Sequence, residues 1–369
     1  MQSLARPGYT AAEIIAALHA AGAHWAFRYE LLDGEGSYIG DLDGVQSASI
    51  NLNSLAEIHR TARFTLRDTG EVNFLADRVR PYIRLRMADG GWAEWPQGVF
   101  LLSTPPRRVG ATGAVTREVE AYDLLQVLAD DKLEDRLTVA AGTNYIAAVG
   151  AQLDAAGLAA RNLTATDLVL PAGRDWPGGT GRLRVINDLL GAINYRPLWM
   201  DELGQAIAQP YVSPADRAPE YAYRDDAQSV LLPEVEQGLD LFAVPNKWVL
   251  VVSEPDRDPM VSTYTNTNAA SPTSTVSRGR TIVDYRDRQE AADQATLDAL
   301  AARVAFEASQ VYEQVRFDTG IMPMHSHGDV LTLSYSRLGL NHKYLETSWG
   351  LELRAGARMQ HQARRVVSV

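Results

Sequence analysis

The chain has 369 residues, 46% of them hydrophobic and 22% charged, so it is long enough for two or more domains with a sizeable core. It contains no cysteine, which excludes disulfides, thiolate zinc sites and a cysteine nucleophile. Its formal net charge of -11 repels phosphate, so we expect no sequence-specific nucleic acid binding.

The N-terminal segment predicts a short helix rather than an export signal. In "TAAEIIAALHAAG", Thr10 can cap the helix and Glu13 interrupts the apolar run. No apolar stretch of the chain reaches the roughly 20 residues that a membrane span needs. We therefore expect residues 1–23 to form a helix and arm, and we expect no membrane segment.

Residues 24–123 predict an antiparallel sheet. The segments "SASINLN", "TARFTLRD" and "YIRLRM" alternate apolar and polar residues, which gives each strand one buried side and one solvent-facing side. Glycine and proline turns separate the strands, as in "ADGGW" and "STPP". Several short strands joined by turns predict a closed or nearly closed antiparallel β-barrel.

Arginines are concentrated between residues 60 and 86, at Arg60, Arg63, Arg67, Arg78, Arg80, Arg84 and Arg86. Two interpretations stay open. The arginines line the solvent-facing side of the sheet, or they contact an acidic partner subunit through charge-assisted hydrogen bonds. On the second interpretation, Arg63, Arg67, Arg84 and Arg86 are candidate subunit contacts.

The pattern changes to helices near Asp123. "DLLQVLADDKL" is helical, Thr143 can cap a helix over "NYIAAVGAQLDAAG", and another helix covers roughly residues 180–193. "YRPLWMDELGQAIAQPYV" predicts a hairpin with Gly204 in its turn. Residues 124–212 therefore predict a small α+β unit.

A further β region follows and contains the best helix of the chain. Trp248 to Val252 forms a strongly apolar strand, and "YTNTNAASPTSTVSRGR" predicts a long exposed loop because it has no apolar periodicity. Residues 289–312 predict a helix, with apolar residues from Leu297 to Val311 at three- and four-residue spacing. The last segments, "VLTLSYS", "KYLETSWGLELRAG" and "ARMQHQARRVVSV", return to strands.

The segment "MPMHSHGDVL" is the one metal-like pattern in the sequence. On an extended strand, His325, His327 and Asp329 would share one face and supply three ligands to a metal ion. However, Pro323 and Gly328 indicate a turn that opens onto a strand from Val330 to Tyr335. We favour the edge of a strand with solvated histidines, and we predict no metal site and no cofactor.

Enzyme signatures are absent from the sequence. It contains no G-x-S-x-G, G-x-x-x-x-G-K-[ST] or H-E-x-x-H pattern, so we predict no catalytic residues. Two alternatives remain: a metal-dependent hydrolase at the histidine cluster, or a carbohydrate-binding tip protein that uses Trp92, Trp95 or Trp176. Trp92 and Trp95 flank a turn, and we expect them to pack the end of the barrel.

Several segments together resemble the hub module of phage tail-associated, or minor tail, proteins of phages with long non-contractile tails. They are "DLDGVQSASINLN", "VNFLADRVRPYIRL", "WPQGVFLLSTPP" and "EVEAYDLL", followed by "VPNKWVLVV", "MHSHGDVLTL" and "YLETSWGLELRAGARMQHQARR". Each segment is weak alone. Their order and spacing carry the resemblance from about residue 25 to the end.

The resemblance implies an α+β, mainly β fold with two antiparallel β-barrels and two smaller α+β inserts. Carried onto this chain, the first barrel is residues 24–123 and the first insert 124–212. The second barrel combines residues 213–236 and 317–369, and the second insert, residues 237–316, holds the long helix.

The resemblance also implies a structural role without enzymatic activity. Three copies would form a ring in the tail tip that joins the hexameric tail tube, or a distal tail protein, to the threefold tip, and the ring would line part of the DNA conduit. Further partners would be a tape measure protein and a tail fibre or receptor-binding chain. The chain would be a virion component assembled in the host cytoplasm, and Arg364 and Arg365 near the basic end are further candidate subunit contacts.

Overall fold

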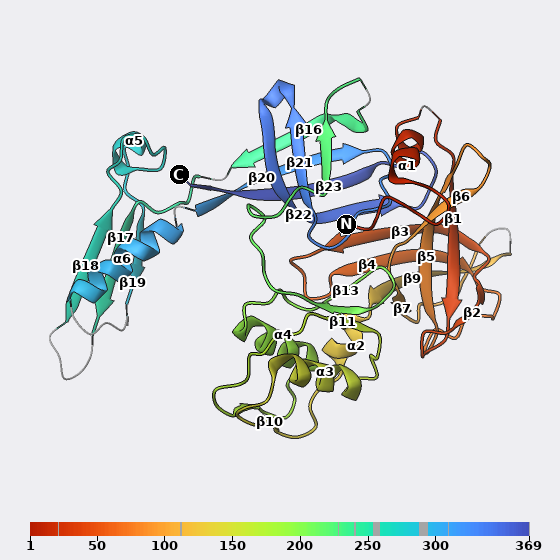
Figure 1. Ribbon diagram of the computed structural model, residues 1–369, viewed down its shortest axis with the longest axis horizontal. Coiled ribbons are helices and arrows are strands. Elements are labelled where there is room, and N and C mark those ends of the chain that lie inside the picture. The colour runs from red at the N-terminus through yellow and green to blue at the C-terminus, as the bar shows by residue number, and fades with distance from the viewer. Residues whose placement is uncertain are drawn as a thin grey trace. The chain divides into compact units, whose positions relative to one another are not determined.

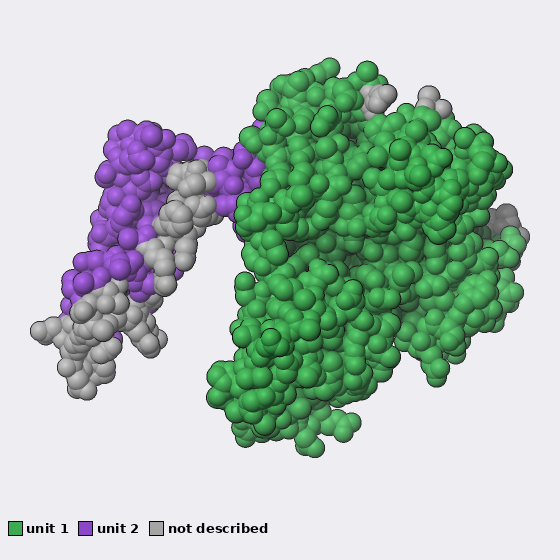
Figure 2. Space-filling view, in the orientation of Figure 1, with its two compact units in different colours: residues 1–235, 317–363 green, residues 236–316, 364–369 purple. Residues whose placement is uncertain are grey.

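The computed structural model describes residues 1–20, 22–110, 113–227, 229–239, 241–253, 259–287, 294–308 and 310–368. Most of the regular structure is β-strand (Figure 1). The chain forms two compact units, unit 1 with residues 1–235 and 317–363, and unit 2 with residues 236–316 and 364–369 (Figure 2). No helix within the described residues is long and apolar enough to cross a membrane.

The first part of unit 1 is an antiparallel sheet preceded by one helix, α1 (Ala11–Leu18), which Thr10 and Glu13 cap as the sequence predicts. The strands are β1 (Trp25–Leu32), β2 (Tyr38–Asp41), β3 (Val45–Asn53), β4 (Arg60–Arg67), β5 (Arg78–Arg86), β6 (Trp92–Pro96), β7 (Phe100–Leu102), β8 (Arg108–Val109) and β9 (Val115–Asp123). Their order is β3-β4-β9-β7-β5-β1-β2, with β6 paired to β5 and β8 to β9.

Strands from the end of the chain extend the same sheet. They are β15 (Tyr221–Arg224), β16 (Leu231–Leu239), β20 (Gln310–Thr319), β21 (Val330–Tyr335), β22 (Leu340–Glu352) and β23 (Met359–Ser368), with a 3-10 turn, η1, at Ser336–Leu338. β22 pairs antiparallel with β3, with Trp349 opposite Leu52 and Leu351 opposite Ile50. The result is one 15-stranded sheet whose path runs from β16 to β2. The predicted mainly β fold is confirmed, and its strands form one large, mostly antiparallel sheet. The two predicted barrels are not confirmed, because among the described residues no sheet closes.

The alternation in the sequence predicts which side of each strand is buried. Ala48, Ile50 and Leu52 of β3 are buried, as is Phe64 of β4. Arg60 is the exception, because it follows the buried phase of β4 and is 1% exposed. The interpretation of all seven arginines as a solvent-facing set is wrong at this position.

A buried ion pair explains the position of Arg60. Its Nη2 lies 2.8 Å from Glu202 Oε1, and its backbone N–H donates to Asp123 Oδ2 at 2.8 Å. The guanidinium can be buried because a carboxylate neutralises it. Arg60 therefore ties the sheet to the following α+β segment.

That α+β segment contains α2 (Leu125–Asp130), β10 (Leu137–Val139), α3 (Tyr145–Ala155), β11 (Arg161–Leu163), β12 (Arg174–Trp176), α4 (Arg182–Ala192), β13 (Trp199–Met200) and β14 (Ala206–Ala208). The three predicted helices are present. Asn144, and not Thr143, caps α3, because its side chain accepts hydrogen bonds from the backbone N–H groups of Ile146 and Ala147. Gly204 turns the predicted hairpin at φ +81°.

Unit 2 has a helix packed on a three-stranded sheet. Its elements are β17 (Lys247–Val252), β18 (Met260–Thr265), α5 (Thr275–Arg278), β19 (Val283–Arg286) and α6 (Gln294–Ala308), and the strand order is β18-β17-β19. Trp248, Leu250 and Val252 pack against α6. The predicted helix over 289–312 is too long, because Val311 already belongs to β20, while residues 289–293 lie outside the described residues.

The segment "YTNTNAASPTSTVSRGR" is not the exposed loop that the sequence predicts. It contains the end of β18 and α5, and it buries Thr273 and Ser274. The side chain of Asn246, 0% exposed, donates to the carbonyls of Thr273 and Arg280 and accepts from the N–H of Ile282. Polar contacts order this segment, so apolar periodicity could not reveal it.

We expect the substitution Glu202→Ala to destabilise unit 1 strongly. It leaves the Arg60 guanidinium buried without its carboxylate, which costs about 3–5 kcal/mol in free energy of unfolding. Urea unfolding followed by circular dichroism measures the change. The control is Glu352→Ala, which removes an exposed pair with Arg354 and is expected to cost less than about 1 kcal/mol. Equal effects of the two substitutions would contradict the role assigned to the buried pair.

Candidate functional site

The histidine segment lies in a turn before β21 and not on a strand. Gly328, at φ +63°, turns the chain, and Asp329 Oδ2 accepts the Ser326 N–H at 2.9 Å. The predicted start of the strand at Val330 is confirmed. The prediction of solvated histidines is wrong, because His325 is 1% exposed and His327 is half-buried, stacked on His59 and Trp199.

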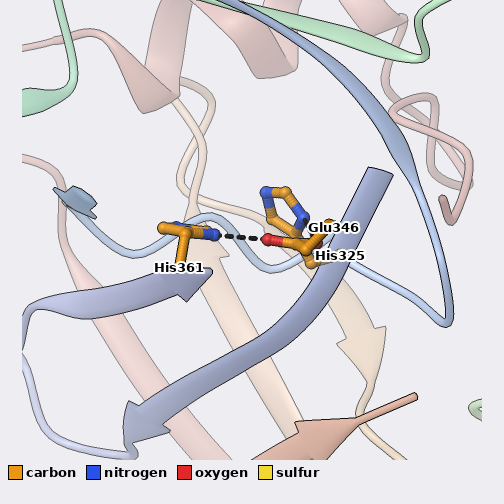
Figure 3. Close-up of side chains that lie close together, drawn as sticks. All are labelled: His325, Glu346 and His361. Carbon is orange, nitrogen blue, oxygen red and sulfur yellow. Dashed lines mark hydrogen bonds and ion pairs between the residues drawn. The ribbon is translucent and has the colours of Figure 1, made fainter. Parts of the chain in front are cut away.

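A carboxylate between two imidazoles forms the centre of the site (Figure 3). His325 Nδ1 lies 2.6 Å from Glu346 Oε2, and His361 Nδ1 lies 2.6 Å from Glu346 Oε1. Asp329 Oδ2 is 3.4 Å from His325 Nδ1. We call His325, Glu346, His361 and Asp329 the His–Glu centre. All four side chains are buried.

Two hydroxyl groups complete the hydrogen bonding of the His–Glu centre. Tyr223 Oη lies 2.6 Å from His325 Nε2, and Thr319 Oγ1 lies 2.9 Å from His361 Nε2. These residues come from β15, β20, β22, β23 and the turn before β21. Side chains from β15 and β20 thus reach the same His–Glu centre. Each nitrogen of the two imidazoles has a hydrogen-bond partner there.

Sequence reasoning found His325 and Asp329 and missed Glu346 and His361. Both missed residues occupy buried positions in an otherwise apolar alternation. Glu346 is in phase with Leu340 and Tyr344 on β22, and His361 follows Met359 on β23. An ionisable residue in the buried phase of a strand is the signal that could have found them.

Opposite charges set the protonation of the centre. Burial lowers the pKa of His325, but the carboxylates of Glu346 and Asp329 more than offset it and raise the pKa to about 9. Burial raises the pKa of Glu346, yet the two imidazoles hold it below its usual range. Burial lowers the pKa of His361. At neutral pH the centre therefore holds a cationic His325, an anionic Glu346 and a neutral His361.

The donor set of the His–Glu centre is one that divalent metals accept, and one ligand atom from each of His325, Glu346 and His361 lies within 4.8 Å of the others. The distances are shorter than a metal requires. Two ligands on a tetrahedral zinc ion lie about 3.3 Å apart, whereas the nitrogen and oxygen atoms here are 2.6 Å apart. That separation is typical of charge-assisted hydrogen bonds. Glu346 can share its negative charge between the two imidazoles and hold the strands that carry them in place. Because all four side chains are buried, the centre offers no open position to a substrate.

His327 belongs to a different group of side chains. Its ring stacks on His59, with 4.6 Å between centroids, and on Trp199, with 5.1 Å between centroids. Its Nδ1 lies 2.8 Å from Arg196 Nη2. Burial and the neighbouring cations lower the pKa of His327 well below its usual range and that of His59 to about 4. The structure thus brings His325 and Asp329 together and places His327 elsewhere.

The six candidate contact arginines lie on strands, and five of them have partners in their own chain. Arg63 is exposed beside Glu120, Arg67 is exposed on the same strand, and Arg84 lies 2.6 Å from Glu94. The guanidinium groups of Arg84 and Arg86 stack on Trp92. In unit 2, Arg364 stacks on Tyr312, and Arg365 lies 2.7 Å from Glu313. Their role as subunit contacts stays a prediction.

The tryptophans named as carbohydrate contacts are largely covered. Trp95 is 0% exposed and Trp176 is 4% exposed. Trp92 is half-buried under the two arginines that stack on it. A sugar ring needs an open aromatic face, and none of these three side chains supplies one.

Comparisons with solved structures show which proteins share this fold. A tail protein from Neisseria meningitidis MC58 matches over 92% of this chain and 97% of its own, with a TM-score of 0.62 and 10% identity. The 43 kDa tail protein of prophage MuSo2 from Shewanella oneidensis matches over 92% and 98%, with a TM-score of 0.57 and 9% identity.

A third similar chain comes from the Francisella PdpA–VgrG complex in its half-lidded form. The match covers 95% of this chain and 59% of that one, with a TM-score of 0.59 and 7% identity. No family model and no curated protein matches the sequence. The chain has the fold of phage tail proteins, so the resemblance seen in the sequence is confirmed at the level of fold.

We expect His325→Gln to reduce stability in a pH-dependent way. The pKa of His325 in the folded chain, about 9, lies above the unfolded value of 6.5. Its ion pairing therefore contributes fully below about pH 6.5 and is lost as the pH rises through 9. The destabilisation should be larger at pH 6 than at pH 9.5, by at most about 3 kcal/mol.

Urea unfolding of the wild type and the variant at both pH values measures this difference. His342→Gln is the control, since His342 lies on β22 outside the centre and is half-buried. We expect its effect to be the same at both pH values. A cost of His325→Gln that does not change with pH would exclude a charged imidazolium at this position.

Proposed function

We propose that this chain is a structural hub of a phage tail tip. The observation that carries the proposal is the fold shared with two tail proteins over more than nine-tenths of each chain. A match of this extent means that the chain corresponds to those tail proteins as a whole and not to one insert. The site geometry agrees, because the buried polar centre holds strands together and lacks an opening for a substrate.

In the proposed assembly, three copies form a ring between the hexameric tail tube, or a distal tail protein, and the threefold tip. Each copy contributes two β-barrels, residues 24–123 and residues 213–236 with 317–369, so that six barrels surround the axis. Inserts 124–212 and 237–316 and the arm 1–23 complete the chain. The two groups of strands are joined edge to edge by the pairing of β22 with β3.

Electrostatics supports a passive conduit for DNA. The net charge of -11 repels phosphate, so DNA can pass without being held. The exposed arginines Arg63 and Arg67, with Arg84, Arg86, Arg364 and Arg365, are proposed to contact neighbouring copies or an adjoining ring. A tape measure protein and a tail fibre or receptor-binding chain are the other proposed partners. The chain would act in the virion tail tip after assembly in the host cytoplasm.

The two alternative functions have less support. A metal-dependent hydrolase would need an accessible metal with a site for water, and the His–Glu centre is buried and hydrogen-bonded. A carbohydrate-binding tip would need open aromatic faces, and Trp95 and Trp176 are buried. We therefore propose a role without catalysis.

We expect the purified chain to form trimers, measured by size-exclusion chromatography with light scattering. The double substitution Arg63→Glu with Arg67→Glu should raise the dissociation constant of the trimer about tenfold or more. It replaces two cations at each proposed interface with carboxylates, which a neighbouring copy of net charge -11 repels. The matched control is Arg136→Glu, a charge reversal at an exposed arginine of the α+β segment.

A chain that stays monomeric at the highest soluble concentration counts against the hub. If the double variant trimerises as well as the wild type, Arg63 and Arg67 do not contribute to the interface, but the proposed trimeric ring is not contradicted.

A further inference from the structure

A cavity of about 250 Å³ lies within unit 1, between the sheet and the α+β segment. Two arginines line it, Arg78 and Arg80, which are alternate residues of β5. Most of the other lining residues are apolar and come from β1, from the start of β7 and from the α+β segment, among them Leu32, Val99, Leu124, Leu158 and Leu203. A few polar groups beside an apolar wall are typical of a site that binds a small molecule.

The two arginines differ in their partners. Arg80 Nε donates to Glu30 Oε2 at 2.7 Å, so a carboxylate of the same chain already neutralises Arg80. None of the ion pairs among the described residues includes Arg78, and its buried Nε has no hydrogen-bond partner there. Burial lowers the pKa of Arg78, and the charge of Asp33 offsets only part of that effect. The cavity therefore presents a guanidinium that no carboxylate contacts.

The acidic residues near Arg78 do not neutralise it. Asp33 Oδ1 accepts the backbone N–H groups of Glu35 and Ser37 at 2.9 and 2.8 Å, so this oxygen holds the turn after β1. Glu35 also lines the cavity, but its side chain is exposed and water screens its charge. The positive charge of Arg78 thus remains available to an anion that enters from solvent.

We propose that this cavity binds a monocarboxylate with a short apolar body. The carboxylate lies on Arg78, whose planar guanidinium can donate two parallel hydrogen bonds to it, and the apolar body lies against the leucines and Val99. A phosphate monoester carries close to two negative charges. The cavity offers one guanidinium without a contact, with Asp33 and Glu35 nearby, so a singly charged anion fits better. The inference goes beyond the proposed hub and does not depend on it, because the cavity lies within one chain.

The volume of the cavity limits the length of the ligand. A water molecule takes about 30 Å³, so the cavity has room for about eight waters. Hexanoate, with about eight non-hydrogen atoms, matches this room, whereas a long-chain fatty acid exceeds it. Two sources can supply the same chemistry, a free acid or the last residue of a partner polypeptide. The experiment below distinguishes them.

Binding of four probes to the full-length chain tests the proposal, measured by ligand-detected NMR titration. Hexanoate has the charge and the apolar body, hexan-1-ol has the body without the charge, and acetate has the charge without the body. N-Acetylvaline stands for the end of a polypeptide. We expect hexanoate to bind with a millimolar or lower dissociation constant. This constant should be at least about tenfold below those of hexan-1-ol and acetate.

The substitution Arg78→Gln should weaken hexanoate binding at least about tenfold and leave hexan-1-ol binding unchanged, which shows that the cavity is still formed. Arg136→Gln is the matched control, because Arg136 is an exposed arginine of the α+β segment outside the cavity. We expect it to leave the binding of both probes unchanged. If Arg78→Gln weakens hexan-1-ol as well, Arg78→Lys decides, since it keeps the charge. Retained hexanoate binding then supports the proposal, and lost binding overturns it.

Three results would overturn the proposal: no binding of hexanoate or N-acetylvaline above millimolar concentration, equal binding of hexanoate and hexan-1-ol, or hexanoate binding that Arg78→Gln does not change. Binding that depends on Arg78 supports it for either source. Tighter binding of hexanoate assigns the site to a free acid. Tighter binding of N-acetylvaline assigns it to the end of a partner chain.

Discussion

Unit 1 depends on the antiparallel pairing of β3 with β22. This ladder joins a strand near the beginning of the chain to one near the end, with Trp349 opposite Leu52 and Leu351 opposite Ile50. These four buried side chains remove apolar surface from water on one face of the paired strands. The backbone N–H and C=O groups along the facing edges of β3 and β22 hydrogen-bond to each other. Without it, the strands before residue 124 and the strands after residue 220 would form separate sheets with exposed edges.

The His–Glu centre gives the later strands a fixed arrangement that apolar packing alone would not specify. Glu346 can be buried as a carboxylate only if both imidazoles keep their places around it. Such a network penalises a register shift, because a shift of one residue moves Glu346 or His361 to the other face. We infer that the centre makes the pairing of these strands specific. The histidine pattern resembles a metal site in the sequence, but in the structure His325 hydrogen-bonds to Glu346 and has a structural role.

Much of the fold could be predicted from residue alternation and capping. The strand from Val330 to Tyr335, the helix capped by Thr10 and the hairpin at Gly204 all follow from local chemistry. The failures share a cause. Arg60, Asn246 and Glu346 are polar residues whose burial is made possible by partners far away in the sequence, and no local pattern records those partners. The end of the long helix was misplaced because Val311 fits both a helical stripe and the alternation of β20.

The candidate site could be predicted only in part for the same reason. His325 and Asp329 lie close together in the sequence, so their pairing was visible, whereas Glu346 and His361 join them through the sheet. His327 was assigned to the same group because residues two apart share a face of a strand, but the turn at Gly328 sends its ring toward Trp199 instead. The proposed barrels and the proposed subunit contacts depend on sheet closure and on other copies of the chain, and no local pattern of the sequence reports either.

The pairing of β3 with β22 also imposes an order of events during synthesis. β3 is translated roughly 300 residues before the part of β22 that pairs with it, and a ribosome adding about 5–20 residues per second takes on the order of 15–60 s to cover that distance. Throughout this time the edge of β3 is an unoccupied template for any extended chain nearby. The alternate residues Ser47, Ser49, Asn51 and Asn53 make one face of β3 hydrophilic. This face keeps the nascent sheet compatible with water until its last strands are made.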